Sequence, residues 1–372
     1  MTSHDPPLTA AQRAALDHVR ASAPALGGAA RLGAVPSGAA VHAAVRERAR
    51  VTLNFHPDRL LADGSRIAER LAADGRYRGQ FETGVSNGSR TAHPGGDRDR
   101  WEESLFGGAY HGRGVAPGDR PKYGALNVLH HPDGAAPRFG SCHVRLRAEV
   151  AARCTFCVGD SHAGPVDVGT YDAFEAVLAG VLEEASETGL LLGVPTADPA
   201  AGLGAAAPVP GAPNGAVLDH YVEAQVHGPV DLARDAEALV LDPSFAGTAV
   251  GDVLTEAAAR FGVGLEWHTG FVLHSSAVPA GFRGPAIPPL ADRVARRYTA
   301  DGMLTAEVVG RAAASLAVEP GAWAEFGTYD EVLQYVKQLW HVLVEFGEPY
   351  ATGLRARNTS SRPGRSGASR TS

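Results

Sequence analysis

Residues 219–228 read DHYVEAQVHG, a stretch in which polar and apolar side chains alternate. Successive side chains of an extended segment point to opposite faces, so Val222, Ala224 and Val226 would face a core. Gly228 would then end the strand and open the mouth of a cleft. A solvent-facing strand is the alternative, although the row lacks the Lys, Arg and Thr expected of such a face. The polar face would carry Tyr221, Glu223, Gln225 and His227.

The chain around this strand mixes strand-like and helical segments. Helical spacing of apolar residues marks both ends of the chain, as in TAAQRAALDHVRAS at 9–22 and YDEVLQYVKQLWHVLVEFG at 329–347. Neither a regular βαβ alternation nor a glycine fingerprint opening a helix is visible, so a Rossmann fold has little support. The sequence therefore predicts an α+β protein with a mostly antiparallel strand region between helical ends. Further strand-like segments are VTLNF at 51–55, GSCHVRLRAEVAARCTFCVGD at 140–160, AEALVLD at 236–242 and VGLEWHTGFVLHSS at 263–276.

Composition and pattern divide the chain into four parts. We expect an N-terminal helical segment over 1–49, a mixed α+β catalytic-like domain over 50–285 and a C-terminal helical region over 286–350. The tail over 351–372 is rich in Arg, Ser and Gly and is expected to be disordered. Residues 195–218 are too rich in Pro and Gly for regular structure, so we expect an exposed loop there.

The overall composition limits the classes of function. The 372 residues carry 34 Lys or Arg against 41 Asp or Glu, a net charge of −7, so general nucleic-acid binding is not expected. No run approaches the roughly 18 apolar residues of a membrane span, and the polar N-terminus lacks an apolar signal segment. Three cysteines are too few for a disulfide framework. We therefore expect a cytoplasmic protein that binds no membrane, with its oligomeric state left open.

Two internal helices carry recognisable end signals. Ser65 is expected to cap the helix SRIAERLAADG, which Gly75 closes. Thr170 is expected to cap the helix TYDAFEAVLAGVLEEASETG.

A second polar row follows the first of these helices, in GRYRGQFETGVSNGS at 75–89. An arginine in a strand, followed by glycine, can present its planar fork to a phosphate or carboxylate that approaches the backbone closely. Arg78 is the candidate, and an exposed strand edge with a solvated polar face is the alternative. If the segment is extended, one face carries Arg76, Arg78, Gln80 and Glu82.

Two more segments combine polar groups with apolar neighbours. RPKYGALNVL at 120–129 places Tyr123 beside a glycine, where a ring or phosphate has room to pack; a simple turn explains it equally well. CTFCVGDSH at 154–162 holds one CxxC pair without the second pair that a zinc site usually needs, so small buried cysteines are expected. Ser161 follows at the strand end, where a hydroxyl is well placed to shape a site.

Signatures of several enzyme classes are missing. HExxH, the G-x-S-x-G nucleophile elbow and the P-loop are all absent from the sequence. A metal-dependent hydrolase would require His56 and Asp58 beside a third ligand, and no metal is expected. The other histidines are scattered along the chain: His130, His131, His268 and His274.

Six segments together resemble a bacterial family known as domain of unknown function 3626. The resemblance spans roughly residues 40–340 and by itself implies no activity. The segments are NFHPDR, YRGQFETGVSNG, RWEESLFGGAY, RPKYGALN, FGSCHVRL and YVEAQVHG.

The order of YRG, RPKYG, the TFxxGDS strand and YVEAQVHG also looks like the ADP-ribosyltransferase domains of phage-associated toxins. That resemblance implies a split, antiparallel sheet core and NAD as substrate, with Arg78 on the phosphates and Glu223 as catalytic carboxylate. Thr155 or Ser161 would supply a hydroxyl, and Tyr123 would stack near nicotinamide. Gln225 and His227 would complete the site from the strand of Glu223.

One departure from that toxin pattern concerns the acid. Many members carry Glu or Gln, a spacer and then the catalytic Glu, whereas this chain has Glu223, Ala224 and Gln225. Either the site is offset, or its activity is altered or lost.

The expected function is an NAD-dependent ADP-ribosyltransferase-like enzyme with an unknown acceptor. One alternative is a non-catalytic binding protein of the same fold, with a blocked cleft and Glu223 paired with an arginine. The other is the metal-dependent hydrolase described above. The first hypothesis requires Arg78 and Glu223 to face one cleft.

Overall fold

The structure is a computed structural model that describes residues 7–84, 91–207 and 218–350. Neighbouring strands of its main sheet are antiparallel except for one parallel pair at the edge, so the sheet is mixed. The structure thus confirms a fold of mixed α and β type built on one large sheet. Across this sheet the strands follow the order β12 (Gly264–Trp267), β11 (Ala236–Leu241), β4 (Cys142–Leu146), β1 (Arg50–Phe55), β3 (Lys122–Asn127), β9 (Val222–Val226), β5 (Cys154–Val158) and β6 (Val168–Thr170).

The predicted strand in DHYVEAQVHG is β9, which lies inside the sheet between β3 and β5. Val222, Ala224 and Val226 belong to the hydrophobic core, as the alternation indicated. The polar residues are buried as well, so the solvent-facing alternative is wrong. In register across β3, β9 and β5 lie the rows Tyr123, Gln225, Thr155 and Ala125, Glu223, Cys157.

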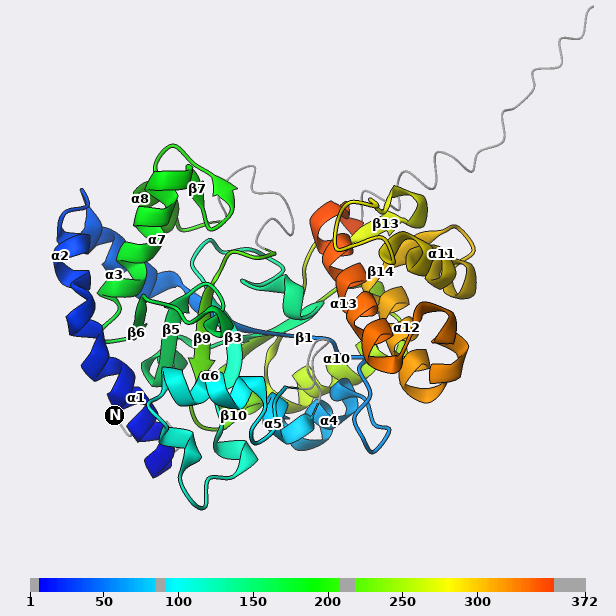
Figure 1. Cartoon of the computed structure of the whole chain (residues 1–372), viewed down its shortest axis with the longest axis horizontal. Helices are drawn as coiled ribbons and strands as arrows, with labels where there is room; N and C mark the ends of the chain where they lie inside the picture. Colours follow the sequence, from blue (N-terminus) through cyan, green and yellow to red (C-terminus); the bar gives the residue numbers. More distant parts are fainter. Residues whose placement is uncertain (1–6, 85–90, 208–217, 351–372) are drawn as a thin grey trace, which may run out of the picture.

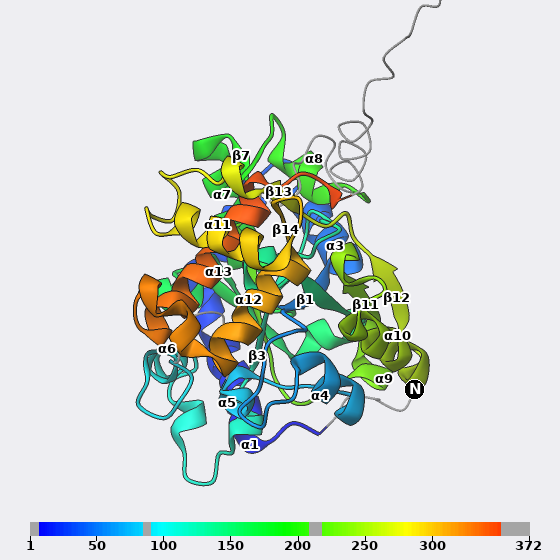
Figure 2. The same ribbon diagram turned by 90° about the vertical axis from the view of Figure 1, so that its right-hand side faces the viewer.

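Helices surround the sheet in separate groups (Figure 1). Figure 2, turned by 90°, shows α10 (Ala249–Phe261) and α9 (Leu232–Asp235) beside β11 and β12. Helices α4 (Ile67–Asp74), α5 (Gln80–Thr83) and α6 (Asp97–Leu105) lie close together below the sheet in Figure 1. On the side of β6 are α1 (Ala10–Ser22), α2 (Gly28–Gly33), α3 (Gly38–Arg48), α7 (Glu175–Thr188) and α8 (Pro199–Gly204); on the opposite side are α11 (Ile287–Tyr298), α12 (Ala306–Val318) and α13 (Tyr329–Phe346).

One hydrophobic cluster joins the sheet to the C-terminal helices. It includes Leu53 of β1, Val144 of β4 and Trp340 of α13, all without exposed surface. The indole Nε1 of Trp340 donates a hydrogen bond to the carbonyl oxygen of Pro137 at 2.8 Å, which satisfies the polar atom of a buried ring. Across the described ranges, every helix is too short or too polar to span a lipid bilayer.

Three local expectations are wrong. Helix α4 has Arg66 as its N-cap, one residue after Ser65, and the Arg66 N–H donates to the Glu69 carboxylate at 2.8 Å. Thr170 ends β6, and α7 begins only at Glu175. The third error lies in the expected loop at 195–218, where Asp198 caps the short helix α8; residues 208–217 lie outside the described ranges.

The segment 75–89 also differs from the extended row that was expected. Strand β2 covers only Arg76–Tyr77 and pairs with β10 (Val230–Asp231). The Glu82 carboxylate accepts a hydrogen bond from the Gly79 N–H at 2.8 Å, and this cap turns the chain into α5. Residues 85–90 and the tail 351–372 lie outside the described ranges. The other short strands are β7 (Leu190–Leu191) with β8 (Val194–Pro195), and β13 (Val272–His274) with β14 (Met303–Thr305).

Candidate functional site

A cavity of about 130 Å³ lies where the end of β1, the beginning of β3 and residues 76–83 meet. Rings of Tyr77, Tyr123 and Phe139 line it. Glu223 supplies the only carboxylate among the described lining residues. The same walls carry the guanidinium-bearing residues Arg59, Arg70, Arg76, Arg78 and Arg98. The site is therefore strongly positive, aromatic in part, and has one acid in its wall.

Glu223 is almost fully buried and is held at both carboxylate oxygens. The Gln225 Nε2 donates to Oε1 at 2.7 Å, and the Ser161 backbone N–H donates to Oε2 at 3.3 Å. Burial and the neighbouring Asp160 raise the pKa of Glu223, while Ser161, Arg98 and Gln225 act in the opposite direction. The carboxyl group is therefore fixed in position and binds a proton more readily than an exposed glutamate.

A line of buried hydrogen bonds runs behind Glu223, through side chains that are at most 1% exposed. The Thr155 hydroxyl donates to Gln225 Oε1 at 2.7 Å, so the His227 Nε2, 3.1 Å from that hydroxyl, must donate to it. His227 Nδ1 then accepts from the Tyr110 hydroxyl. Burial, with Lys122 and Arg153, lowers the pKa of His227 to about 3, so its ring is neutral.

All the hydrogen bonds of this line are donated in the same direction. Donation runs from Tyr110 through His227, Thr155 and Gln225 to Glu223. Thr155, Gln225 and His227 therefore lie behind the acid and do not line the cavity. Their role here is to hold Glu223 in place rather than to contact a ligand.

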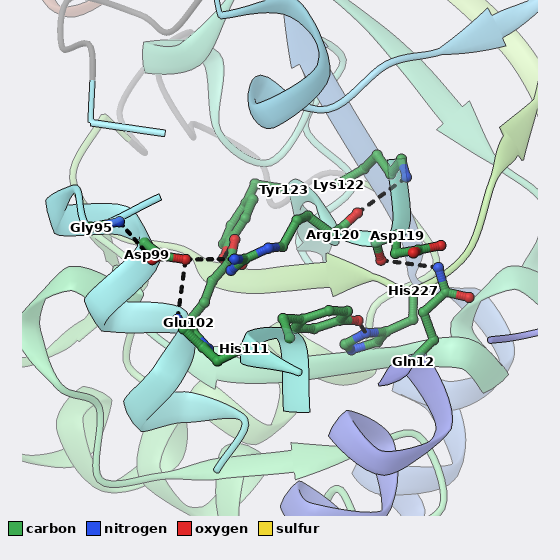
Figure 3. A network of polar contacts seen from close by, with 11 residues as sticks. Gln12, Gly95, Asp99, Glu102, His111, Asp119, Arg120, Lys122, Tyr123 and His227 are labelled. Atoms are coloured by element: carbon green, nitrogen blue, oxygen red, sulfur yellow. Dashed lines mark hydrogen bonds and ion pairs between the residues drawn. The ribbon is translucent and has the colours of Figure 1, made fainter. Parts of the chain in front are cut away.

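Tyr123 is fixed by a second network, shown in Figure 3. Its hydroxyl donates to Glu102 Oε1 at 2.9 Å, and Arg120 donates to the other oxygen of Glu102 at 2.7 Å. Arg120 also binds Asp99 at 2.6 Å, and the Gly95 N–H donates to Asp99. Burial raises the pKa of Tyr123 well above its usual range, so its phenol stays a neutral donor.

Arg78 lies in the turn between β2 and α5, at the edge of the cavity. Its guanidinium is paired with Asp74, with Nε 2.9 Å from Oδ2, and the side chain is 40% exposed. Arg78 therefore reaches the cavity from a turn, whereas a position on a strand was expected.

Of the residues predicted from the sequence, the structure brings Arg78, Tyr123 and Glu223 to one cavity. Ser161 contacts the site through its backbone N–H, and its hydroxyl makes no recorded contact with Glu223. Sequence reasoning missed Arg98, whose guanidinium lies 4.3 Å from the centre of the Tyr123 ring, and Glu102, which holds that tyrosine. RWEESLFGGAY contains Glu102, but its spacing gave no sign of a partner on β3.

The cysteines and the possible metal ligands form no metal-binding group within the described ranges, although Cys157 of β5 lies beside Glu223. Cys154 and Cys157 are buried free thiols, and burial raises the pKa of Cys154 to about 12, as suits small core residues. His56 lines the cavity, whereas the Asp58 carboxylate lies against Gly310 of α12. Within the described ranges, no group of three or more His, Cys, Asp or Glu residues is arranged to hold a metal ion.

Comparison with known proteins identifies a family for the chain. The model of a family described as "Protein of unknown function (DUF3626)" matches residues 50–346, a range that contains the whole lining of the cavity. A search of the curated proteins finds no match to the chain.

Proposed function

The chain belongs to the DUF3626 family, whose description assigns no activity, and from its cavity we propose that it is an NAD-dependent ADP-ribosyltransferase-like enzyme. One observation carries the proposal: Arg78 and the buried acid Glu223 line the same positive, partly aromatic cavity. The finer assignment of the sheet to the ADP-ribosyltransferase type belongs to the same proposal.

Glu223 would act on the ribose next to nicotinamide. When the bond between C1′ and the nicotinamide nitrogen breaks, its electron pair leaves with nicotinamide and positive charge develops on the ribose. The Glu223 carboxylate would stabilise that charge and accept a hydrogen bond from the 2′-hydroxyl. An acceptor nucleophile then forms the new bond to C1′ and loses its proton, which completes the transfer.

The other lining groups suit the rest of a dinucleotide. A guanidinium binds a pyrophosphate through two parallel hydrogen bonds, and Arg78 keeps donors beyond those it gives to Asp74. Tyr77, Tyr123 and Phe139 offer ring faces for a planar base. The enclosed volume is small, so it would hold the reacting end of the ligand and leave the remainder at the mouth.

The order of Glu223 and Gln225 bears on whether the site is active. In this arrangement the acid lines the cavity, and the amide two residues later holds one of its oxygens. That supports an offset site, in which Glu223, at the first position of the motif, is the catalytic acid and Gln225 takes the second position. The non-catalytic alternative expects Glu223 to be paired with an arginine, and among the described residues no such ion pair is recorded.

The test is nicotinamide release from NAD by the full chain, compared with Glu223→Gln. The variant keeps the shape of the side chain but removes its charge, so the rate should fall about 100-fold or more. Glu187→Gln, at an exposed position of α7, is the matched control and should keep the wild-type rate. If wild type neither binds NAD nor releases nicotinamide, the proposal is wrong. Binding of NAD without release would instead favour the non-catalytic protein.

A further inference from the structure

A second cavity, of about 330 Å³, lies over β4, β11 and β12. His143 of β4 lines it, and on the neighbouring strand Asn54 lines the first cavity. The two residues are paired across the strands, so both cavities open on the polar face of the sheet. Residues 132–136 lie between them and are held down by Asn54, which donates to the Asp133 carbonyl at 3.1 Å. The second cavity is therefore separate from the site proposed for NAD.

Two imidazoles of this second cavity each have one buried ring nitrogen without a hydrogen-bond partner among the described residues. His143 is 2% exposed and His131 is 6% exposed, and both line the cavity. Within the described part of the chain, the buried Nδ1 of His143 and Nε2 of His131 have no hydrogen-bond partner. The adjacent His268 differs, because its Nε2 lies 2.8 Å from the Ser141 carbonyl and its Nδ1 accepts from Gly270. Buried polar groups are normally satisfied, so two unsatisfied imidazoles among the lining residues of one cavity make it a candidate ligand site.

The charges around these imidazoles favour an anion. Arg48, Arg50 and Arg145 bring three positive charges to the lining. Two lining acids oppose them, and both are paired with lining arginines: Arg145 contacts Glu266 at 2.6 Å and Glu237 at 3.2 Å, and Arg50 contacts Glu237 at 3.5 Å. These acids are about half exposed, so they face the rim more than the interior. The lining arginines therefore outnumber the lining acids by one before any imidazole takes up a proton.

We infer that this second cavity binds the oxyanion group of an anionic ligand, such as a phosphate or sulfate group, between His131, His143 and the arginines at its rim. A neutral imidazole can donate one N–H to an oxyanion, and a protonated one can donate two. Guanidinium groups at the rim complete the donor set.

Binding of an anion should draw protons into the cavity. Burial, with His268 and Arg145, holds the pKa of His143 well below its usual range, so its ring is neutral when the cavity is empty. Burial also lowers the pKa of His131, with Asp133 acting to raise it and His130 to lower it. A negative charge placed beside these rings favours their protonated forms. Affinity should therefore rise as pH falls.

Sulfate is the suitable probe, because its charge does not change between pH 6 and 8. Calorimetric titration of the full chain at constant ionic strength should show sulfate binding about five-fold tighter or more at pH 6 than at pH 8. Histidine side-chain NMR should show the His131 and His143 signals shifting towards the protonated form as sulfate is added. Arg50→Gln, a change at the rim that leaves the core intact, should weaken binding about five-fold, and His143→Gln should also weaken binding and reduce the shift of the His131 signal.

Arg78→Gln, in the first cavity, is the matched control and should leave the His131 and His143 shifts unchanged. Loss of those shifts in Arg78→Gln, or sulfate binding that does not move them, would place the anion elsewhere and overturn the inference. So would a shift of the same signals by Zn²⁺ and not by sulfate, which would make the cavity a metal site. None of these readouts depends on NAD, so this inference and the proposed enzyme activity can fail separately.

Discussion

Gln225 and Glu223 are joined by a hydrogen bond of 2.7 Å between the amide Nε2 and the carboxylate Oε1, two residues apart on one strand. Both side chains are nearly inaccessible to solvent. This bond therefore helps to fix the position of the acid, and it lowers the pKa of Glu223. It also connects the cavity with the buried hydrogen bonds behind it.

Gln225→Leu should remove that bond while keeping the volume of the side chain. Glu223 Oε1 and the Thr155 hydroxyl then lose partners, and the free energy of unfolding should fall by about 1–3 kcal/mol. Because the Gln225 bond lowers the pKa of Glu223, its loss should raise that pKa and move the pH profile of nicotinamide release to higher pH. Chemical denaturation and a rate profile measure the two effects. Thr155→Val, one bond further away, should move the profile less, and an unmoved profile in Gln225→Leu would contradict the role assigned to the amide.

Tyr123→Phe should distinguish the role of the Tyr123 ring from that of its hydroxyl. Glu102 Oε1 loses the donor that lies 2.9 Å away, so stability should fall by about 1–3 kcal/mol in a denaturation experiment. The ring face remains in the cavity, so the KM for NAD should stay close to the wild-type value. Tyr171→Phe, whose hydroxyl bonds to an exposed carbonyl, should cost less than about 0.5 kcal/mol. Equal losses of stability in the two variants would show that the hydrogen bond to Glu102 stabilises the fold no more than an exposed one.

Asp58 should make the stability of the protein depend on pH. Burial raises its pKa from 3.8 to about 6, so the folded state binds the proton more tightly than the unfolded chain. The stability is then fully present below about pH 4 and is lost as pH rises through 6, a change of about 3 kcal/mol. Asp58→Asn should remove this part of the dependence in urea titrations between pH 4 and 7. The exposed Asp252→Asn should keep it, and a wild-type slope in Asp58→Asn would refute the assignment.

Gly310→Ala should destabilise the contact between α12 and the end of β1. An added Cβ would lie 1.2 Å from the Asp58 Oδ2, so the carboxylate has to move, at a cost of about 1–3 kcal/mol. Gly33→Ala in α2 meets nothing within 4 Å and should instead be neutral or stabilising by up to about 1 kcal/mol. Melting temperatures of the two variants should therefore move in opposite directions or, at the least, differ clearly.

The sequence predicted the parts of the fold that depend on local alternation. DHYVEAQVHG forms the predicted strand, because apolar residues at every second position need a core on one side only. Its polar row was singled out as a candidate site, and Tyr110, Phe106 and Ser161 lie against that face and help to bury it. The resemblance to DUF3626, expected over roughly residues 40–340, is confirmed by the family model, which matches residues 50–346.

The wrong predictions come from competition between local hydrogen bonds. Glu82 accepts from the Gly79 N–H and turns an apparent strand into a helix, and Glu69 accepts from the Arg66 N–H and so moves the start of α4 past Ser65. The expected and the observed hydrogen bonds satisfy the same kinds of polar group, so the spacing of residues in the sequence does not distinguish the two arrangements.

The second cavity was missed because its groups meet only in three dimensions. His131 and His143 come from two segments of the chain, and the arginines Arg48 and Arg145 come from a helix end and a strand. Read along the sequence, these histidines are scattered and show no ligand spacing. The role of Arg98 was missed for the same reason, since its contact with Tyr123 links α6 to β3.

Gln225, which lies behind Glu223, affects how the acid can exchange protons. An amide group does not relay a proton as a hydroxyl or an imidazole does. Proton transfer along the line from Tyr110 through His227 and Thr155 therefore stops at Gln225. Proton exchange between Glu223 and this buried line is therefore blocked, whereas the cavity gives the acid direct access to a ligand. A ligand that fills the cavity would slow proton exchange at the acid on that side.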